Sequence, residues 1–335
     1  EMNKLKNNNH DSIGVLGSGL MGHGIAYAAA ISGFHVLMVD LTKNQANKGL
    51  QKIYQILEKS FKKGFISKQE LDDIKSRIEI SYDYEMLETT KIIIEAIYED
   101  LDVKTKALKT AEKYMNPNGF IASNTSTIPI SILASKLINP QNFIGLHFFS
   151  PVHKMKLVEV IKGEKTSSAT LSRALNFALQ IRKTPIVVND SPGFYTTRVF
   201  VKYPFEGMTM LREGIKASSI ENAGKKAGYP VGPLALSDEV NIALIGRIRK
   251  QILKYDKKNS KEPWDKVIEL MVTNLNREGR SGTGGFYDYP TNQKKHIWKN
   301  LEKHFPILAN EIPGKDIVDR LIFSQILEAI SCLLY

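Results

Sequence analysis

The stretch IGVLGSGLMGHGIA at residues 13–26 decides the fold of the N-terminal half of this 335-residue chain. A short apolar run leads into three glycines, Gly17, Gly19 and Gly22, and an alanine-rich segment that favours a helix follows them. HVLMV at residues 35–39 then predicts a second buried strand. The order strand, tight turn, helix and strand is typical of the opening of a βαβ unit.

The glycine spacing in this setting indicates a dinucleotide-binding turn. The first glycine permits the tight turn, the second lets backbone N–H groups approach a pyrophosphate, and the third allows close packing of helix on strand. Asp40 follows the second strand, 18 residues after Gly22. Its carboxylate would accept hydrogen bonds from ribose hydroxyls and repel a 2′-phosphate, so we expect NAD rather than NADP. The alternative, a glycine turn used only for packing, does not explain why an acid, Asp40, follows the second strand.

Strands and helices continue to alternate up to residue 188, which predicts a mostly parallel sheet covered by helices. Expected helices span 44–63, 68–77, 101–114 and 130–137, and expected strands span 92–97, 120–122, 143–149, 158–161 and 185–188. Turn residues at 189–193 mark a domain boundary, and helical periodicity follows them. We predict an α/β Rossmann-type domain at 1–188, an all-α domain at 189–290 and the start of a second, truncated helical repeat at 291–335.

The helical part contains an internal similarity. Arg198, Glu206 and Leu211 recur 122 residues later as Arg320, Glu328 and Leu333. Three matches can arise by chance, so a true repeat and a coincidence both remain open. The last residues lie in an apolar helical stretch with no C-cap signal, from which we expect a segment of a longer chain.

His147 is the first candidate for catalysis. It lies in the strand-like run GLHFFSP at 145–151, where large apolar neighbours would exclude water. A buried histidine in a strand is more often a core residue with its hydrogen bonds satisfied. Glu159 favours a catalytic role, because it interrupts the apolar run LVEVI at 157–161, where an unpaired carboxylate is costly. We expect the two to pair, which fixes the imidazole tautomer and stabilises the imidazolium of a general base.

Polar side chains also follow two other predicted strands. SNTS at 123–126 lies at the sheet edge where open α/β folds bind their ligands. The alternative role of these residues is an N-cap for the helix that starts near Ile130. Glu99 and Lys104 follow another strand, and taken alone they would be a solvated helix start.

Composition narrows the class of protein. The chain is 42% hydrophobic and 24% charged, as globular proteins are, and no apolar run reaches the roughly 18 residues of a membrane-spanning helix. Cys332 is the only cysteine, so no intrachain disulfide can form, and a reducing, cytoplasmic location fits best.

The net charge of +11 suggests a polyanionic partner. The basic residues are scattered, however, so an ordinary lysine-rich surface also explains the charge, and a small molecule that carries several phosphates would account for it as well as nucleic acid would. With no nucleic-acid-binding motif among these residues, we expect no nucleic acid as partner.

Nine motifs in order resemble the L-3-hydroxyacyl-CoA dehydrogenase family. They are IGVLGSGLMGHGIA, HVLMVD, IIIEAIYEDLDVK, ASNTS, GLHFFSP, MKLVEVI, DSPGFYTTR, AGYPVGP and GGFYDY, spread over residues 12–289. The tail DRLIFSQILEA at 319–329 resembles the start of the second helical repeat in the dehydrogenase part of multifunctional fatty-acid oxidation enzymes. The resemblance implies a helical domain of the 6-phosphogluconate dehydrogenase type, NAD as cofactor and an acyl-CoA substrate. It also implies a homodimer or membership of a larger oxidation chain, and no metal.

The implied reaction is NAD-dependent oxidation of (S)-3-hydroxyacyl-CoA to 3-ketoacyl-CoA in fatty-acid β-oxidation. By the resemblance, His147 is the base that takes the proton of the 3-hydroxyl group as hydride passes to nicotinamide, and Glu159 orients it. Ser126 contacts substrate and cofactor, and Thr197 stands beside the base. The implied cofactor-binding positions are Gly17, Gly19, Leu20, Met21, Gly22, Asp40, Glu99, Lys104, Ser126 and Ser150.

Substrate binding is expected at Ser126 and Thr197, and at Lys59 and Lys63 on the helix after Asp40. The two lysines would contact phosphates of coenzyme A, although each taken singly is more often an ordinary surface lysine.

Three positions depart from the commonest family pattern. Thr197 and Ser150 each stand where an asparagine is usual, and Ser281 stands where a lysine often precedes the last glycine-rich turn. These changes put rate, acyl preference and cofactor affinity in question more than reaction type. Two alternatives remain open: a non-catalytic protein of the same fold, like lambda-crystallin, and a 3-hydroxybutyryl-CoA dehydrogenase that works in the reductive direction.

Overall fold

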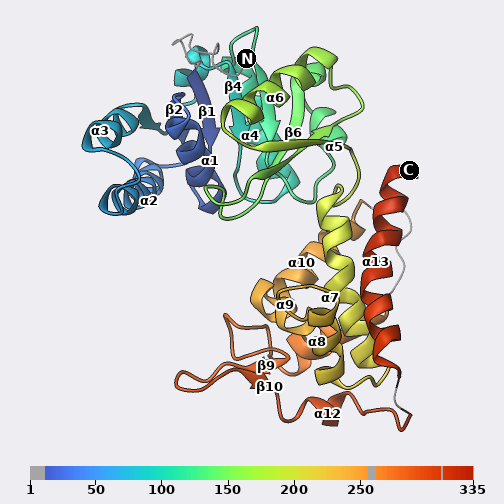
Figure 1. The fold of residues 1–335 in the computed structure, drawn as a ribbon. Coiled ribbons are helices and arrows are strands. Elements are labelled where there is room, and N and C mark those ends of the chain that lie inside the picture. The colour runs from blue at the N-terminus through green and yellow to red at the C-terminus, as the bar shows by residue number, and fades with distance from the viewer. Residues whose placement is uncertain (1–11, 256–261, 311, 335) are drawn as a thin grey trace, which may run out of the picture. The chain divides into compact units, whose positions relative to one another are not determined.

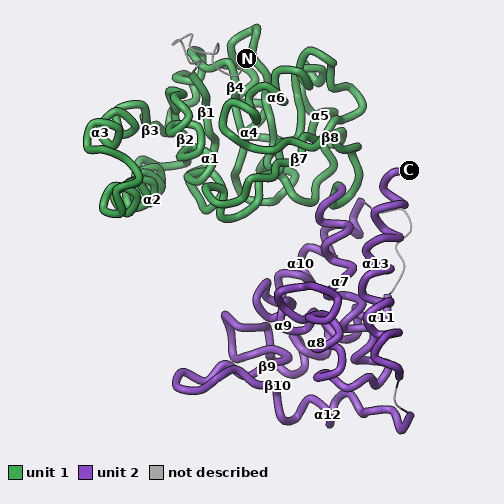
Figure 2. The backbone as a smooth tube through the Cα atoms, in the orientation of Figure 1, with its two compact units in different colours: residues 1–194 green, residues 195–335 purple. Residues whose placement is uncertain are grey.

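The computed structural model describes residues 12–255, 262–310 and 312–334. The structure divides into two compact units: unit 1 ends at Phe194 and unit 2 begins at Tyr195 (Figure 2). Within the described residues, no helix is both long and apolar enough to cross a membrane.

Unit 1 is built around one eight-stranded sheet (Figure 1). Its strands are β1 (Ser12–Leu16), β2 (His35–Val39), β3 (Ile78–Ser81), β4 (Ile92–Glu95), β5 (Phe120–Ser123), β6 (Phe143–Phe148), β7 (Leu157–Lys162) and β8 (Thr184–Asn189). They lie in the order β3-β2-β1-β4-β5-β6-β7-β8, and every neighbouring pair is parallel except β6 with β7. This order contains the 3-2-1-4-5-6 arrangement of dinucleotide-binding sheets, so the predicted α/β Rossmann-type class is confirmed.

The helices of unit 1 connect these strands and bury their apolar faces on the sheet. They are α1 (Leu20–Ile31), α2 (Lys43–Lys62), α3 (Lys68–Ser76), α4 (Leu101–Tyr114), α5 (Ile130–Ala134) and α6 (Ser168–Gln180), with short 3₁₀ helices at Glu85–Thr89 and Pro140–Asn142. The alanine-rich α1 packs against β1 and β2, and Ile13, Val15, Ile25 and Met38 are fully buried there. Small side chains on α1 let the helix approach the sheet closely, which holds the turn before it in place.

Two elements differ from prediction. The sequence does not predict β3, because its four residues IEIS are too short for a clear alternation; Ile78 is buried and Glu79 is exposed. The helix predicted to reach residue 137 ends at Ala134. The chain turns there, and the Glu112 carboxylate accepts hydrogen bonds from the N–H groups of Ile138 and Asn139.

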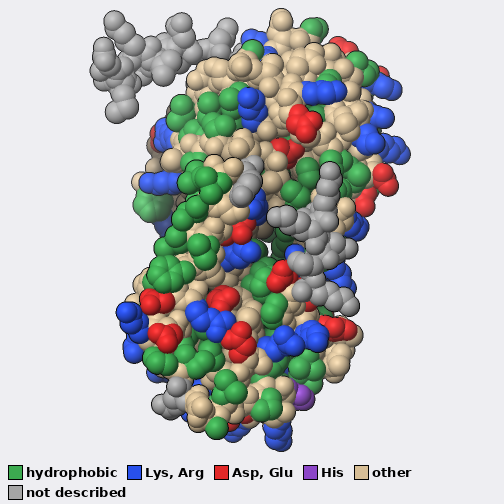
Figure 3. All heavy atoms as spheres, turned by 90° about the vertical axis from the view of Figure 1, so that its right-hand side faces the viewer, with side chains coloured by type: hydrophobic (Ala, Val, Ile, Leu, Met, Phe, Trp, Pro, Cys, Tyr) green, Lys and Arg blue, Asp and Glu red, His purple; other side chains and the backbone are tan. Residues whose placement is uncertain are grey.

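Unit 2 is helical, as predicted, apart from a two-stranded antiparallel ribbon. Its helices are α7 (Thr196–Arg212), α8 (Ala217–Lys226), α9 (Pro233–Val240), α10 (Ile242–Leu253), α11 (Pro263–Glu269), α12 (Leu301–His304) and α13 (Gly314–Leu334); a π-helical turn covers Leu270–Asn274, and the ribbon joins β9 (Tyr287–Asp288) to β10 (His296–Ile297). Helix α7 is the central element, because α8, α9, α11 and α13 all pack on it. In the lower part of Figure 3, which draws one face of unit 2, acidic and basic side chains are interspersed.

Helices α7 and α13 lie side by side and are joined by reciprocal ion pairs (Figure 1). Arg198 Nε lies 2.7 Å from Glu328 Oε1, and Arg320 Nε lies 2.7 Å from Glu206 Oε1. An early residue of α7 therefore pairs with a late residue of α13, and the two helices run antiparallel. Each helix contributes one arginine and one glutamate at matching positions 122 residues apart, as two copies of one helix related by a two-fold axis would.

A double-mutant cycle tests this pairing. We expect Arg198→Ala and Glu328→Ala to show a coupling free energy of unfolding of about 1 kcal/mol, because both side chains are largely buried. The exposed pair Lys68–Asp72 on α3 serves as the control and should couple by only ~0.3 kcal/mol. Urea unfolding of the four proteins in each cycle measures both values. Zero coupling between Arg198 and Glu328 would contradict the pairing.

Asp238 on α9 organises the glycine-rich segment of unit 2. Its side chain is fully buried and accepts hydrogen bonds from the N–H groups of Phe286 (2.8 Å) and Tyr287 (2.9 Å) and from the Tyr289 hydroxyl (3.0 Å). A Cβ on Gly285 would lie 1.9 Å from Asp238 Oδ1, so only glycine fits there. Burial raises the pKa of Asp238 to about 6 even though these hydrogen bonds oppose the shift.

This raised pKa predicts a pH-dependent stability. Because folded Asp238 binds a proton more tightly than the unfolded chain does, its contribution is present below pH 3.8 and is lost as the pH rises through about 6. The free energy of unfolding of the wild type minus that of Asp238→Asn should therefore fall by about 2.4 kcal/mol between pH 4 and pH 7. Urea unfolding followed by tryptophan fluorescence reports on unit 2 alone, since Trp264 and Trp298 are the only two tryptophans. A pH-independent difference would refute the prediction.

Candidate active site

The turn between β1 and α1 gives each of its glycines a separate task. Gly17 has φ +91°, a left-handed conformation that favours glycine. Gly19 caps α1 with backbone alone, and a Cβ there would meet no atom within 4 Å. A Cβ on Gly22 would lie 1.8 Å from the Gly17 carbonyl oxygen. The turn thus presents an open helix N-terminus, with Leu20 and Met21 in its first turn, which fits the pyrophosphate of a dinucleotide.

Asp40 lies beside this turn, at the end of β2. Its Oδ2 accepts hydrogen bonds from the N–H group (2.7 Å) and the hydroxyl of Ser18, and its Oδ1 accepts one from the Leu41 N–H group (2.7 Å). The carboxylate is held against the glycine turn and stays half-buried. This placement fits an acceptor for ribose hydroxyls next to the pyrophosphate site.

Removing the negative charge of Asp40 tests its expected role. In Asp40→Asn, repulsion of a 2′-phosphate disappears and one acceptor for the ribose is lost. We expect the NADH to NADPH affinity ratio to fall by about 10-fold, since a charged hydrogen bond contributes about 1.5–3 kcal/mol. Fluorescence titration with both cofactors measures the ratio. Asp72→Asn, on the exposed face of α3, is the matched control, and an unchanged ratio in Asp40→Asn would exclude the role.

Glu99 orders the loop after β5 that carries Ser126. Its Oε1 accepts hydrogen bonds from the N–H groups of Ser126 (2.9 Å) and Thr127 (3.1 Å) and from the hydroxyls of Thr125 (2.6 Å) and Thr127 (3.0 Å). The alternative that SNTS caps the next helix is wrong, because Pro129 is the N-cap of α5. Asp190 instead accepts hydrogen bonds from the first N–H groups of that helix.

Lys104 is buried and not part of a solvated helix start. Its side chain is 1% exposed, and its ammonium nitrogen lies 2.6 Å from Glu95 Oε1 and 3.1 Å from Glu99 Oε2. Burial works against the charged ammonium, but the two carboxylates outweigh it and raise the pKa of Lys104 above its usual value. Burial likewise opposes ionisation of Glu99, yet Lys104 and the loop hydrogen bonds hold the pKa of Glu99 below its usual value. Both groups are therefore charged at neutral pH.

His147 and Glu159 pair as predicted. They face each other in the antiparallel register of β6 and β7, with His147 Nδ1 2.7 Å from Glu159 Oε2. Both are buried, the histidine at 6% and the glutamate at 0% exposure. The rings of Phe149 and Phe194 flank the imidazole at 4.7 and 5.9 Å between centroids. The carboxylate thus fixes the ring through Nδ1 in apolar surroundings, as a general base requires.

The structure brings most of the predicted site residues to one edge of the sheet. Because β1, β2, β4, β5 and β6 are parallel, the glycine turn, Asp40, Glu99, the Ser126 loop and the end of the His147 strand share that edge. Lys59 and Lys63 are exposed near the end of α2, and Ser150 is exposed after β6. The roles of these exposed residues stay predictions.

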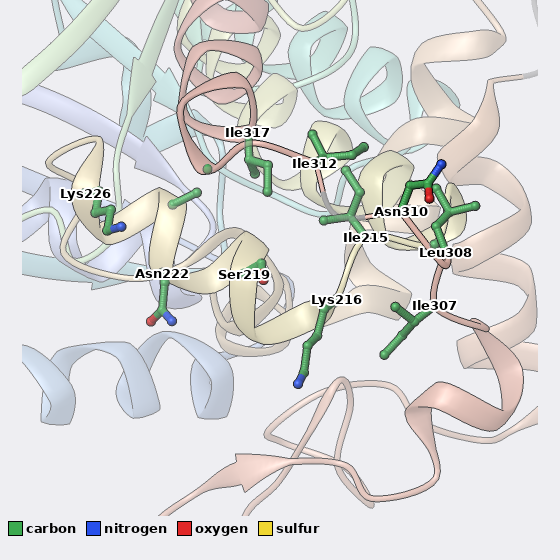
Figure 4. A pocket seen from close by; sticks show the side chains of 13 residues that line it. Ile215, Lys216, Ser219, Asn222, Lys226, Ile307, Leu308, Asn310, Ile312 and Ile317 are labelled. Carbon is green, nitrogen blue, oxygen red and sulfur yellow. The ribbon is translucent and has the colours of Figure 1, made fainter.

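Two predicted positions lie in unit 2. Thr197 is the second residue of α7, and its role likewise stays a prediction. Ser281 accepts a hydrogen bond from the Asn241 amide at 2.9 Å. A cavity of about 320 Å³ in this unit, between α8 and the segment 307–317, contains none of the predicted site residues (Figure 4).

Sequence reasoning missed one buried residue at the sheet edge, Glu95, which is fully buried and pairs with Lys104. Asn124, in the predicted SNTS segment, is buried too, and its Oδ1 accepts a hydrogen bond from Phe148 N–H at 2.9 Å. Glu95 interrupts the apolar run IIIEAI just as Glu159 interrupts LVEVI. The signal that found Glu159 was therefore also present for Glu95.

A dinucleotide turn, an acid held beside it and a buried histidine–glutamate pair on one Rossmann sheet define a class, the NAD-dependent oxidoreductases. Comparison with protein-family models gives the family. Residues 12–191 match the 3-hydroxyacyl-CoA dehydrogenase NAD binding domain, and residues 193–289 match the 3-hydroxyacyl-CoA dehydrogenase C-terminal domain. The chain belongs to the 3-hydroxyacyl-CoA dehydrogenase family, which confirms the resemblance of its motifs, the enzyme class and NAD as cofactor.

Solved structures of this family are similar over most of the chain. (S)-3-hydroxybutyryl-CoA dehydrogenase PaaH1 from Ralstonia eutropha is 34% identical with a TM-score of 0.79, over 84% of this chain and 100% of that chain. The 3-hydroxybutyryl-CoA dehydrogenase from Escherichia coli K12 is 28% identical with a TM-score of 0.80, over 85% of this chain and 61% of that chain. The dehydrogenase part of multifunctional enzyme 1 from C. elegans shares the fold, with 22% identity and a TM-score of 0.66 over 97% of this chain and 74% of that chain.

Proposed function

We propose that this enzyme oxidises (S)-3-hydroxyacyl-CoA to 3-ketoacyl-CoA as a step of fatty-acid β-oxidation, with His147 as general base and Glu159 as the group that orients it. The observation that carries the proposal is the buried pair, 2.7 Å apart, on the sheet that also presents the dinucleotide turn. The single cysteine supports a reducing, cytoplasmic location.

In the proposed mechanism, bound NAD supplies the hydride acceptor. His147 takes the proton of the 3-hydroxyl group on Nε2, because Nδ1 is engaged by Glu159. The imidazolium that forms is stabilised by the Glu159 carboxylate in surroundings where a lone positive charge would be costly. Ser126, on the loop ordered by Glu99, hydrogen-bonds the substrate oxygen. Thr197 offers one hydroxyl to the site, shorter than the asparagine usual at that position.

Binding roles complete the proposal. The glycine turn with Leu20 and Met21 would hold the pyrophosphate, Asp40 the ribose, and Glu99, Ser126 and Ser150 the nicotinamide half. Lys104 would act on the cofactor through Glu99, since its own ammonium is buried. Lys59 and Lys63 would bind the phosphates of coenzyme A, because they are exposed and positively charged.

We further propose that the segment from residue 291 begins a second helical repeat, with α13 as the counterpart of α7. The reciprocal ion pairs support this. Ile326, Leu327 and Ile330 on α13 are 44, 66 and 46% exposed. The residues 122 positions earlier on α7 are Pro204, Phe205 and Met208, and all three are buried in unit 2. In this proposal, α13 occupies the face of α7 that a second copy of the chain would otherwise contact. The proposal therefore favours a chain that is part of a larger protein over a homodimer formed through α7.

Turnover with acetoacetyl-CoA tests the reaction. We expect NADH consumption by the wild type, little with NADPH, and a fall in kcat of about 10²–10⁴-fold in His147→Ala, because proton transfer loses its base. His35→Ala, at an exposed position on β2, is the matched control and should keep wild-type activity. NADH binding that raises the melting temperature without any turnover would contradict the proposal and favour a non-catalytic role.

A further inference from the structure

Glu95 is a carboxylate with no exposed surface at the centre of the sheet. It ends β4, between β1 and β5. Its side chain accepts hydrogen bonds from Lys104 Nζ (2.6 Å), from the Ser123 hydroxyl (2.5 Å) and from Ile97 N–H (2.8 Å). One buried group therefore connects the loop after its own strand, helix α4 and the end of β5.

Two routes lead from Glu95 to the loop that carries Ser126. In the first, Lys104 binds Glu95 and Glu99 together, and Glu99 accepts the hydrogen bonds of the loop. In the second, the Ser123 hydroxyl donates to Glu95 and accepts a hydrogen bond from Thr125 N–H at 3.2 Å. Both routes end within residues 125–127.

The same loop is also hydrogen-bonded to β6, the strand that carries the proposed base His147. Asn124 N–H donates to the Glu95 carbonyl oxygen at 2.8 Å, and Asn124 Oδ1 accepts from Phe148 N–H at 2.9 Å. Phe148 directly follows His147 in β6. The backbone around Glu95 is thus continuous, through hydrogen bonds, with both the Ser126 loop and the His147 strand.

The charges of Glu95, Lys104 and Glu99 depend on one another. One ammonium lies between two carboxylates, and only Glu99 has appreciable exposure, 30% of its side chain. A buried ammonium that loses a partner must shift towards the remaining one or lose its proton. Either response moves Glu99, because Lys104 is bound to it, and a shift of less than 1 Å in groups that orient reactants is enough to slow catalysis.

We propose that Glu95 is a positioning residue, which acts through Lys104 and Ser123 to hold Glu99 and the Ser126 loop in the geometry that the reaction needs. This inference rests on the proposed function for its effect on turnover. Its structural content, that Glu95 immobilises residues 125–127, does not depend on that function and can be measured separately.

The test uses Glu95→Gln in the full chain, because glutamine keeps the size of the side chain and removes its charge. We expect kcat with acetoacetyl-CoA and NADH to fall about 10–100-fold, while the KM for acetoacetyl-CoA changes less than about 3-fold. Glu79→Gln, an exposed glutamate on β3, is the matched control and should keep the wild-type kcat. A kcat within 2-fold of wild type in Glu95→Gln overturns the proposal.

Amide hydrogen exchange supplies a readout that needs no activity. In the wild type, the N–H groups of Ser126 and Thr127 are bonded to Glu99. Their exchange should become about 10-fold faster in Glu95→Gln and stay unchanged in Glu79→Gln. If the wild type itself shows no turnover, the proposed function fails, but this exchange result still decides whether Glu95 holds the loop. Unchanged exchange in the folded variant overturns the positioning role.

Two further variants guard against simple loss of folding. Glu95→Gln combined with Lys104→Met removes both buried charges, and we expect its loss of kcat to be smaller than the product of the two single losses, because Glu95 and Lys104 act in series on the first route. Ser123→Ala cuts only the second route and should speed exchange at Thr125 with a smaller loss of kcat, even if Glu95→Gln does not fold. Multiplicative losses in the double variant, or unchanged exchange in Ser123→Ala, would overturn the two-route arrangement.

Discussion

The physical constraint on which the active-site half depends is that a charge buried in a sheet must have a partner. Glu95 and Glu159 each interrupt an apolar strand and have no exposed surface. In a medium of low dielectric, an unpaired carboxylate is costly to bury. Glu95 is matched by Lys104 and Glu159 by His147, and each match also places a proposed functional group at the ligand-binding edge of the sheet.

The two pairs do different work because their partners differ. Lys104 carries its charge permanently at neutral pH, so the pair with Glu95 and Glu99 is a static support for a loop. Histidine can gain and lose a proton in the course of a reaction, so the pair with Glu159 can serve chemistry. A single principle of charge matching therefore yields both the scaffold, at the end of β4, and the proposed base, on β6 and β7 of the same sheet.

In unit 2, buried carboxylates serve a third purpose, because they accept hydrogen bonds from backbone N–H groups in place of carbonyl oxygens. Asp238 accepts hydrogen bonds from two N–H groups of the glycine-rich segment, and Glu221 accepts them from Leu234 and Ala235 at the start of α9. Asp238 thereby ties the glycine-rich segment to α9, and Glu221 ties the start of α9 to α8. The reciprocal arginine–glutamate pairs of α7 and α13 then add a self-complementary contact on another side of the same central helix.

The sequence by itself determined the Rossmann-type class, the dinucleotide turn, the NAD preference expected from Asp40 and the pairing of His147 with Glu159. These follow from local spacing, because a glycine turn, a strand end and a carboxylate in an apolar run each carry their physical meaning within a few residues. Short elements such as β3 could not be predicted, because four residues hold too little periodicity.

Only the tertiary structure decided the environment of Lys104 and the capping of α5 by Asp190, and only it shows the ion pairs of α7 and α13 that support the proposed repeat. Each depends on residues far apart in the chain that meet across strands or helices. Burial and partnership are properties of that meeting, so a lysine that looks like part of a solvated helix in sequence becomes the centre of a buried charge cluster in space.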